Sequence, residues 1–372
     1  MATERTYTPY IQRGGEIVFK QPYQLGDAEL WGFLLRGTEE NIQRLCDKYL
    51  NEPRLGPGQK LADLDFRYRT DTNLIYLCVD SIGDIDPSGN TKISMSEPAE
   101  LIFWILTRFE RRNEKGIFEF ERFVWFVPYI FVGGSVPAIA AGREVYGMPK
   151  EEAWFTLSPS KKNLTMDTLV YGNGYPKSER AILVEIQEMS TPYNVWDWLD
   201  FTQVLVKEVI EESGKPIGNL ARVVSQIVQD LLNMSIRQVS LKQFRDVKYG
   251  MQACYQEIIE SPFSVSKGTP VLRLLDKDYL VTIKSYESHP IISDLGIKGE
   301  LTNEDFGVTK ITQKPIIGAH LNFDFVLGRG EVIWRSKIDY EEIDLDKNKE
   351  QAEQHRNSNK HPLCKLFDLF GK

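Results

Sequence analysis

The hydrophobic residues of this chain fall mainly in short runs that are typical of β-strands. The runs are rich in β-branched and aromatic residues and are bounded by turn residues, as in strands that pack into a sheet. They are LIYLCVD (Leu74 to Asp80), FVWFVPYIF, AWFTLSP, AILVEI, SIRQVSLKQF, YLVTIKSY and LNFDFVLGRGEVIW. The pattern predicts a β-rich α+β fold with few helices.

Helical periodicity occurs in two places. The segment TEENIQRLCDKY, from Thr38 to Tyr49, predicts a helix with Thr38 at its N-cap. The region from about Tyr193 to Leu232 contains FTQVLVKEVIEES and LARVVSQIVQDLL, whose apolar spacing predicts two amphipathic helices. We expect these helices to pack on the β core; the alternatives are a lid or an oligomer contact.

The last part of the chain changes in character. The segment EEIDLDKNKEQAEQHRNSNKH is polar, which predicts a flexible tail or a solvated helix, and it leads into the short amphipathic piece PLCKLFDLFGK. This piece either folds back on the protein or docks on a partner. The sequence therefore predicts one domain, 1–340, with a helical insertion at about 193–232, followed by a tail, 341–372.

Composition narrows the function classes. Of 372 residues, 42% are hydrophobic and 26% charged, and the net charge is −8. No basic stripe is present, so nucleic acid is not an expected partner. The apolar runs are too short and broken to span a bilayer, and the N-terminus lacks a secretion signal. The cysteines form no CxxC pair, which indicates neither a disulfide framework nor a zinc site. We expect a cytoplasmic protein.

Most familiar catalytic motifs are missing from the sequence. It contains no GxGxxG after a strand, no Walker A loop, no GxSxG and no HExxH, and it has four histidines. His289 and His320 are interpreted as structural. Neither a cofactor nor a metal is therefore expected, and the remaining candidates for chemistry are lysine and carboxylates.

One lysine stands at an unusual place. In AIAAGREVYGMPKEEAWF, Gly147 to Pro149 lead directly to Lys150, which begins an aromatic strand. A lysine that begins a buried strand is costly unless its charge is used, whereas a surface lysine is the ordinary alternative. The preceding Arg143 and Glu144 are interpreted as an ion pair beside the small-residue turn.

The segment AAGREVYGMPKEE resembles the acetoacetate decarboxylase family, whose signature has Ala-x-Gly-Arg-Glu shortly before an aromatic residue, Pro, Lys and Lys. Further pieces resemble the family in the same order: WGFLLRGTEENIQRLCDKYL, SMSEPAELIF, IRQVSLKQFRDVKYGMQACYQEIIESP and AHLNFDFVLGRGEVIWRS. The resemblance spans roughly Trp31 to Ser336. It implies a cone-shaped β-barrel with few helices, usually assembled into homo-oligomers.

The resemblance also implies a site for a small keto acid. Lys150 aligns with the family's Schiff-base lysine, Arg36 with the arginine that binds substrate, and Glu97 with a catalytic glutamate, with Glu100 close by. An iminium on the lysine accepts electrons when the keto acid loses CO2, and it equally serves a dehydration or aldol step. The planar fork of Arg36 suits a carboxylate. Without the resemblance, Arg36 is interpreted as part of a surface ion pair with Glu39 or Glu40.

One residue departs from the family pattern. Many members have Lys-Lys, whereas this chain has Lys150 followed by Glu151. An acidic neighbour on the same face would hold the lysine in its charged form, but alternation along a strand places Glu151 on the opposite face. The sequence therefore predicts a decarboxylase-like lyase; the alternative is a non-catalytic member of the fold that binds a ligand or a partner.

Overall fold

The computed structural model of the chain describes residues 10–11, 17–18, 20–70, 72–87, 93–94, 99–160, 162–172, 175–192, 236–275, 277–303 and 307–336. The chain divides into two units, Met1–Arg335 and Ser336–Lys372, and the account below concerns the first. The predicted helical insertion and the predicted tail lie outside the described residues, so both stay predictions.

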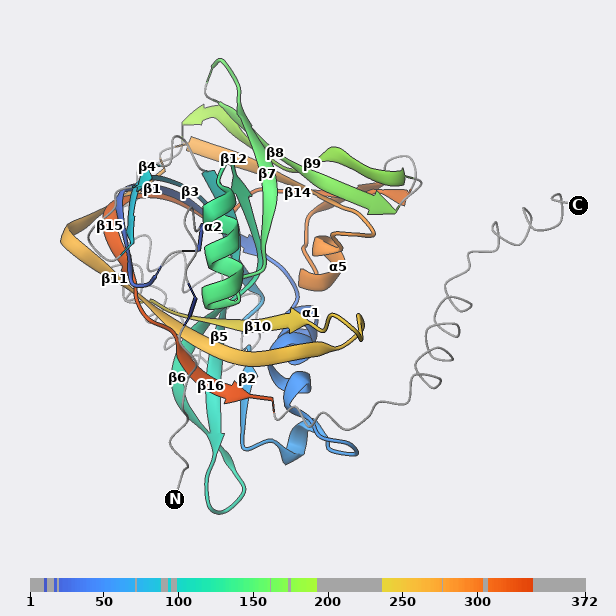
Figure 1. Cartoon of the computed structure of the whole chain (residues 1–372). Coiled ribbons are helices and arrows are strands. Elements are labelled where there is room, and N and C mark those ends of the chain that lie inside the picture. Colours follow the sequence, from blue (N-terminus) through green and yellow to red (C-terminus); the bar gives the residue numbers. More distant parts are fainter. Residues whose placement is uncertain are drawn as a thin grey trace, which may run out of the picture. The chain divides into compact units, whose positions relative to one another are not determined.

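Strands dominate the described part of the chain (Figure 1). They are β1 (Tyr23–Arg36), β2 (Phe66–Arg69), β3 (Leu74–Pro87), β4 (Ile93–Ser94), β5 (Ala99–Arg112), β6 (Phe118–Gly133), β7 (Lys150–Leu157), β8 (Asn163–Gly172), β9 (Tyr175–Pro192), β10 (Ile236–Arg245), β11 (Ala253–Leu274), β12 (Lys277–Ser285), β13 (Glu300–Asn303), β14 (Thr309–Gln313), β15 (Ile317–Leu327) and β16 (Glu331–Arg335). The predicted β-rich fold is confirmed.

Helical segments in the described part are short. They are α1 (Glu39–Cys46), α2 (Val136–Ala141) and α5 (Ile291–Leu295), with the helical turns η1 (Asp47–Asn51), η2 (Glu52–Arg54), η3 (Leu61–Asp63) and η4 (Gly142–Tyr146). The helix predicted from Thr38 to Tyr49 is confirmed as α1 running into η1. Thr38 occupies the N-cap position, although its side chain makes no capping hydrogen bond.

Seven strands close into a ring. Their order is β6, β10, β11, β15, β1, β3 and β5, and β5 pairs again with β6. Neighbours in the ring are antiparallel, except for the parallel pair β6 and β10. Such closure leaves no free edge within the ring, as in a barrel.

The long strand β6 connects this ring to a second wing of the sheet. This strand has 16 residues; Trp125–Phe126 pair with β10, and Ile130–Gly133 pair with β7. From β7 the sheet continues through β8, β9, β12, β14 and β13. The first residue of β7 therefore lies beside the ring, at the branch between the two parts of the sheet.

The apolar run at the start of β3 is explained by burial on both faces. Ile75, Leu77 and Val79 belong to the larger hydrophobic cluster, which also contains residues of α1 and α5. Leu74 and Cys78 belong to a second cluster, formed largely by strands of the ring. A strand buried on both sides needs apolar residues at successive positions rather than at alternate ones.

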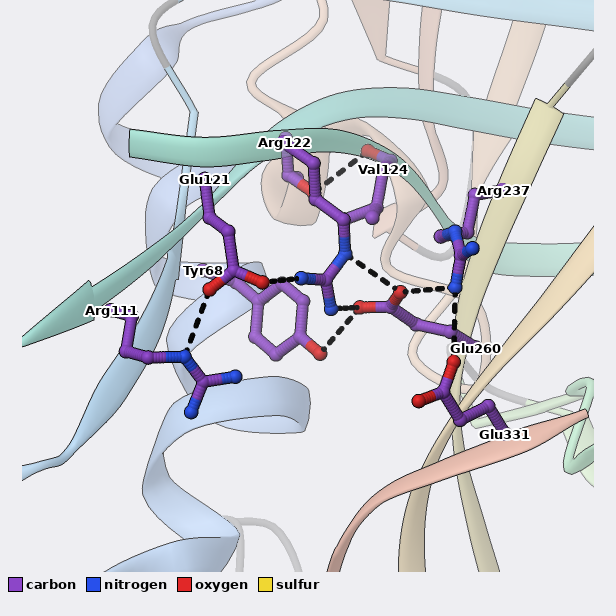
Figure 2. A network of polar contacts seen from close by, with 9 residues as sticks. Tyr68, Arg111, Glu121, Arg122, Val124, Arg237, Glu260 and Glu331 are labelled. Carbon is purple, nitrogen blue, oxygen red and sulfur yellow. Dashed lines mark hydrogen bonds and ion pairs between the residues drawn. The ribbon is translucent and has the colours of Figure 1, made fainter. Parts of the chain in front are cut away.

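A buried carboxylate connects several strands at one side of the ring (Figure 2). Glu260 on β11 is fully buried and accepts hydrogen bonds from Arg122 Nε (3.0 Å) and Nη2 (2.8 Å) and from the Tyr68 hydroxyl (3.3 Å). Arg237 on β10 bridges Glu260 and Glu331 at 3.4 and 3.2 Å. A buried charge requires such partners, so this network links β2, β6, β10, β11 and β16.

Candidate active site

The backbone before Lys150 is fixed by local contacts. The Gly147 residue that ends η4 has a positive φ of 69°, and a β-carbon there would lie 2.4 Å from Lys242 Cα, so only glycine fits without strain. The Lys150 N–H donates to the Met148 carbonyl at 2.8 Å. Arg143 Nη1 donates to the Lys150 carbonyl at 3.1 Å. The conspicuous sequence before the lysine thus fixes where β7 begins.

The interpretation of Arg143 and Glu144 as an ion pair is wrong. Both residues are exposed, and no ion pair joins them within the described part of the chain. Arg143 instead donates to the Lys150 backbone. Burial lowers the pKa of the Lys242 amine, and the nearby Glu144 opposes that effect. The charged pair therefore serves two different neighbours.

The side chain of Lys150 turns into the ring and meets a glutamate. Lys150 Nζ lies 2.6 Å from Oε1 of Glu100 on β5, and the two side chains are 11% and 7% exposed. Lys150 reaches this position by passing over Gly142, where a β-carbon would lie 2.5 Å from Lys150 Cδ. The small residue at 142 therefore leaves the space through which the lysine enters.

A second acid lies directly across from Glu100. Asp80 on β3 pairs with Glu100 in the antiparallel register, so both carboxyl groups are on the same face. Asp80 is buried, and its Oδ1 atom has no hydrogen-bond partner among the described residues. Burial raises the pKa of Asp80 well above its ordinary value, the Glu100 charge raises it further, and Lys150 opposes both effects. Asp80 is thus held in its protonated form more readily than an ordinary aspartate.

These three residues line an apolar cavity of about 130 Å³ inside the ring. Every strand of the ring contributes to its wall, as do α2 and η4. The aromatic lining residues are Tyr23, Tyr76, Trp104, Trp125, Tyr146, Phe263, Phe323 and Phe325, and the larger aliphatic ones are Leu25, Leu30, Ile82, Ile102, Ile130, Ile236, Leu321 and Leu327. The lysine therefore opens into a mainly apolar space that can hold a small organic molecule.

The predicted site residues separate in the structure. Lys150 lies in the cavity, but Arg36 is not among the described residues that line it. Arg36 is the last residue of β1, and its backbone N–H donates to Gln313 Oε1 at 3.0 Å. Glu97 lies outside the described residues. The carboxylate that meets Lys150 is that of Glu100, which the sequence analysis noted only as a neighbour of Glu97. The roles proposed for Arg36 and Glu97 stay predictions.

The predicted orientation of Glu151 is confirmed. Glu151 points away from the cavity and accepts a 2.9 Å contact from the Nε2 atom of buried His289, whose Nδ1 lies 2.9 Å from the Ser288 hydroxyl. His289 thus has structural partners, as expected. Asp80 was not predicted, although its position in LIYLCVD, in step with Tyr76 and Cys78 of the same face, was a usable signal.

Comparison with solved structures identifies the fold of the chain. No family model and no curated protein matches the sequence. An acetoacetate decarboxylase structure superposes with a TM-score of 0.50 at 14% identity, over 87% of this chain and 94% of that one. The chain has the acetoacetate decarboxylase fold. Because the identity is so low, the likeness shows the fold alone.

Two further solved structures are similar at lower scores. Acetoacetate decarboxylase from Legionella pneumophila gives a TM-score of 0.49 at 13% identity, over 88% of this chain and 94% of that one. The enduracididine biosynthesis enzyme MppR, complexed with pyruvate, gives 0.41 at 11% identity, over 86% and 93%. Within the described part of the chain, no helix has the length and apolarity needed to cross a membrane.

Proposed function

We propose that Lys150 forms a protonated imine with the carbonyl group of a small substrate, and that the protein is an acetoacetate decarboxylase-like lyase. The observation that carries this proposal is the Lys150 amine, buried in an apolar cavity and 2.6 Å from a carboxylate. A lysine buried only for structure does not need to open into a ligand-sized space. The acids beside it supply the proton transfers that imine formation requires.

The chemistry starts when Glu100 accepts a proton from the Lys150 ammonium. Neutral Nζ attacks the carbonyl carbon and breaks the π bond of the carbonyl group, and a proton moves from the nitrogen to the oxygen, which becomes the hydroxyl of a carbinolamine. Asp80, which retains its proton readily, donates it as this hydroxyl leaves as water, and the iminium remains. The Asp80 carboxylate then takes up the proton that Glu100 holds, so Glu100 is again negatively charged and stabilises the iminium as it had stabilised the ammonium.

The iminium accepts an electron pair from a bond on the carbon atom next to the former carbonyl carbon. With a β-keto acid this bond is the one to the carboxylate: CO2 leaves, an enamine forms, a proton adds to its carbon, and water releases the ketone and the free lysine. The same electron sink serves a dehydration or a retro-aldol cleavage. A keto acid as substrate, homo-oligomer formation, and a partner of the tail stay predictions from the sequence.

A binding protein of the same fold is the second candidate, favoured by the acidic Glu151 after the lysine. The orientation of Glu151 away from the cavity removes that objection to an imine, because the nearest carboxylate to Lys150 is Glu100. The orientation of Glu151 therefore favours the lyase over the binding protein.

Exchange of the carbonyl oxygen tests the proposal. A ketone that forms an imine and is released by hydrolysis takes its new oxygen from water. In water enriched in oxygen-18, the wild-type protein should accelerate labelling of methyl butyl ketone, and Lys150→Met should reduce labelling to the uncatalysed rate. Equal labelling by the two proteins would contradict the imine, provided that both unfold at similar temperatures.

A further inference from the structure

Among the described residues that line the cavity, no cation other than Lys150 is available to a substrate carboxylate. Lys150 is the single basic side chain among the described lining residues, and Glu100 already pairs with it at 2.6 Å. The third residue of the described lining with an acidic or basic side chain is Asp80, which adds a second carboxyl group. Conversion of the ammonium to an iminium leaves this balance unchanged, because both carry one positive charge.

The polar groups of the described wall are few; some are occupied, whereas the Tyr76 hydroxyl and Asp80 Oδ1 have no hydrogen-bond partner among the described residues. The Tyr146 hydroxyl donates to the backbone carbonyl of Gly328 at 3.0 Å, and the Gln238 amide donates to the Ser240 hydroxyl at 3.2 Å. Apart from the Tyr23 and Tyr76 hydroxyls, the Cys78 thiol and the polar and charged groups named above, the described wall is aromatic and aliphatic. A carboxylate brought into such a wall loses its hydration and gains no charged partner, whereas an ester or an alkyl chain loses little.

The space beside Lys150 is large enough for a small ligand. An apolar cavity of about 150 Å³ in a protein core holds benzene, and this cavity measures about 130 Å³. A molecule with one carbonyl group and about six further carbon atoms fits this range.

From these observations we infer that the carbonyl compound bound here is uncharged, with an apolar body about the size of a benzene ring. The inference rests on the proposed imine at Lys150 and names its substrate class. It favours aldol cleavage or dehydration of an uncharged ketone over decarboxylation of a keto acid. The resemblance predicted a keto acid because it placed Arg36 in the pocket. Arg36 is not among the described lining residues, so this reason for a carboxylate on the substrate is missing.

Levulinate and its methyl ester provide a matched pair of probes. Both present the same methyl ketone, and they differ in carrying a carboxylate or an uncharged ester two carbons away. Each is incubated at equal concentration with the full-length protein and borohydride, and the adduct is measured by intact mass. Lys150→Met, treated in parallel, gives the background from other lysines.

We expect the Lys150-dependent adduct to form at least about tenfold faster with methyl levulinate than with levulinate, which corresponds to about 1.4 kcal/mol. Methyl butyl ketone should behave like the ester. Equal or faster trapping of levulinate would overturn the inference and leave the imine intact. A complete lack of Lys150-dependent adduct with all three compounds would instead contradict the proposed function.

A charge placed in the wall provides the reverse test. Leu30 on β1 lines the cavity, and Leu30→Arg adds the missing cation there. In a folded variant, the preference for methyl levulinate should fall at least tenfold relative to wild type. An unchanged preference in a variant that unfolds cooperatively would show that charge does not decide the selection. If Leu30→Arg does not fold, the wild-type comparison decides by itself.

Discussion

Replacing Gly142 with alanine tests how the lysine is positioned. The backbone there is helical (φ −59°, ψ −46°), so alanine fits the main chain. Its β-carbon, however, would lie 2.5, 2.8 and 3.2 Å from Cδ, Cε and Cγ of Lys150. Ordinary contact begins at 3.4 Å, so the lysine side chain must move by about 0.9 Å.

The expected effects on stability and reactivity differ. Alanine in a helical backbone gains about 0.5–1 kcal/mol over glycine, while overpacking costs about 1–3 kcal/mol. Because the atoms in the way belong to a flexible side chain, we expect the free energy of unfolding of Gly142→Ala to lie within about 2 kcal/mol of the wild-type value. A displacement of this size lengthens the 2.6 Å contact from Lys150 Nζ to Glu100 beyond hydrogen-bond range. Because misplacement of a reacting group by about 1 Å can cost about 100-fold, trapping should fall about 10- to 100-fold.

The assay is the rate of borohydride trapping with methyl levulinate, accompanied by urea unfolding. Gly250→Ala serves as the matched control, because a β-carbon at Gly250 meets no heavy atom within 4 Å. The control should match wild type in both measurements. A folded Gly142→Ala variant that traps at the wild-type rate would refute the claim that the bare backbone at this position admits the lysine to the cavity.

Three other substitutions have expected outcomes. Burial raises the pKa of Asp80 in the folded protein, so the contribution of Asp80 to stability is fully present below a pH of about 3.9 and is lost as the pH rises through the raised pKa. Asp80→Asn should therefore gain stability relative to wild type in urea unfolding as the pH rises from about 4 to 8. A stability difference that stays constant with pH would contradict the raised pKa. Glu260→Gln leaves Arg122 without its buried carboxylate and should cost about 3 kcal/mol of unfolding free energy, with trapping at Lys150 unchanged. Arg36→Lys should leave levulinate trapping unchanged, whereas a marked loss would support the substrate-binding role predicted from the sequence.

The strands and the special position of Lys150 were predictable because their signals are local. Alternating and continuous apolar runs indicate strands, and the fixed turn before Lys150 is visible as Gly147 and Pro149. The partners of Lys150 were harder to predict because they depend on how distant strands align. Asp80 meets Glu100 only through the register of β3 and β5, and the ring itself requires β5 to pair with β6.

The case of Arg36 shows the same limit within a single strand. The irregular pairing in β1 between Leu25 and Ala28 shifts which residues face the cavity, and the lining positions there are Ala28 and Leu30. Arg36 stands six residues beyond Leu30, about 20 Å along an extended chain. The motif contained an arginine on the expected strand, but its distance along that strand determines what the side chain can reach.

The identity of the trapped residue tests the central claim most directly. After borohydride reduction in the presence of methyl levulinate, the full-length protein is digested and the peptide that contains Lys150 is sequenced by mass spectrometry. The account predicts that the added mass is on Lys150 and that it disappears from Lys150→Met while the fold persists. An adduct confined to other lysines, with the Lys150 peptide unmodified, would contradict it.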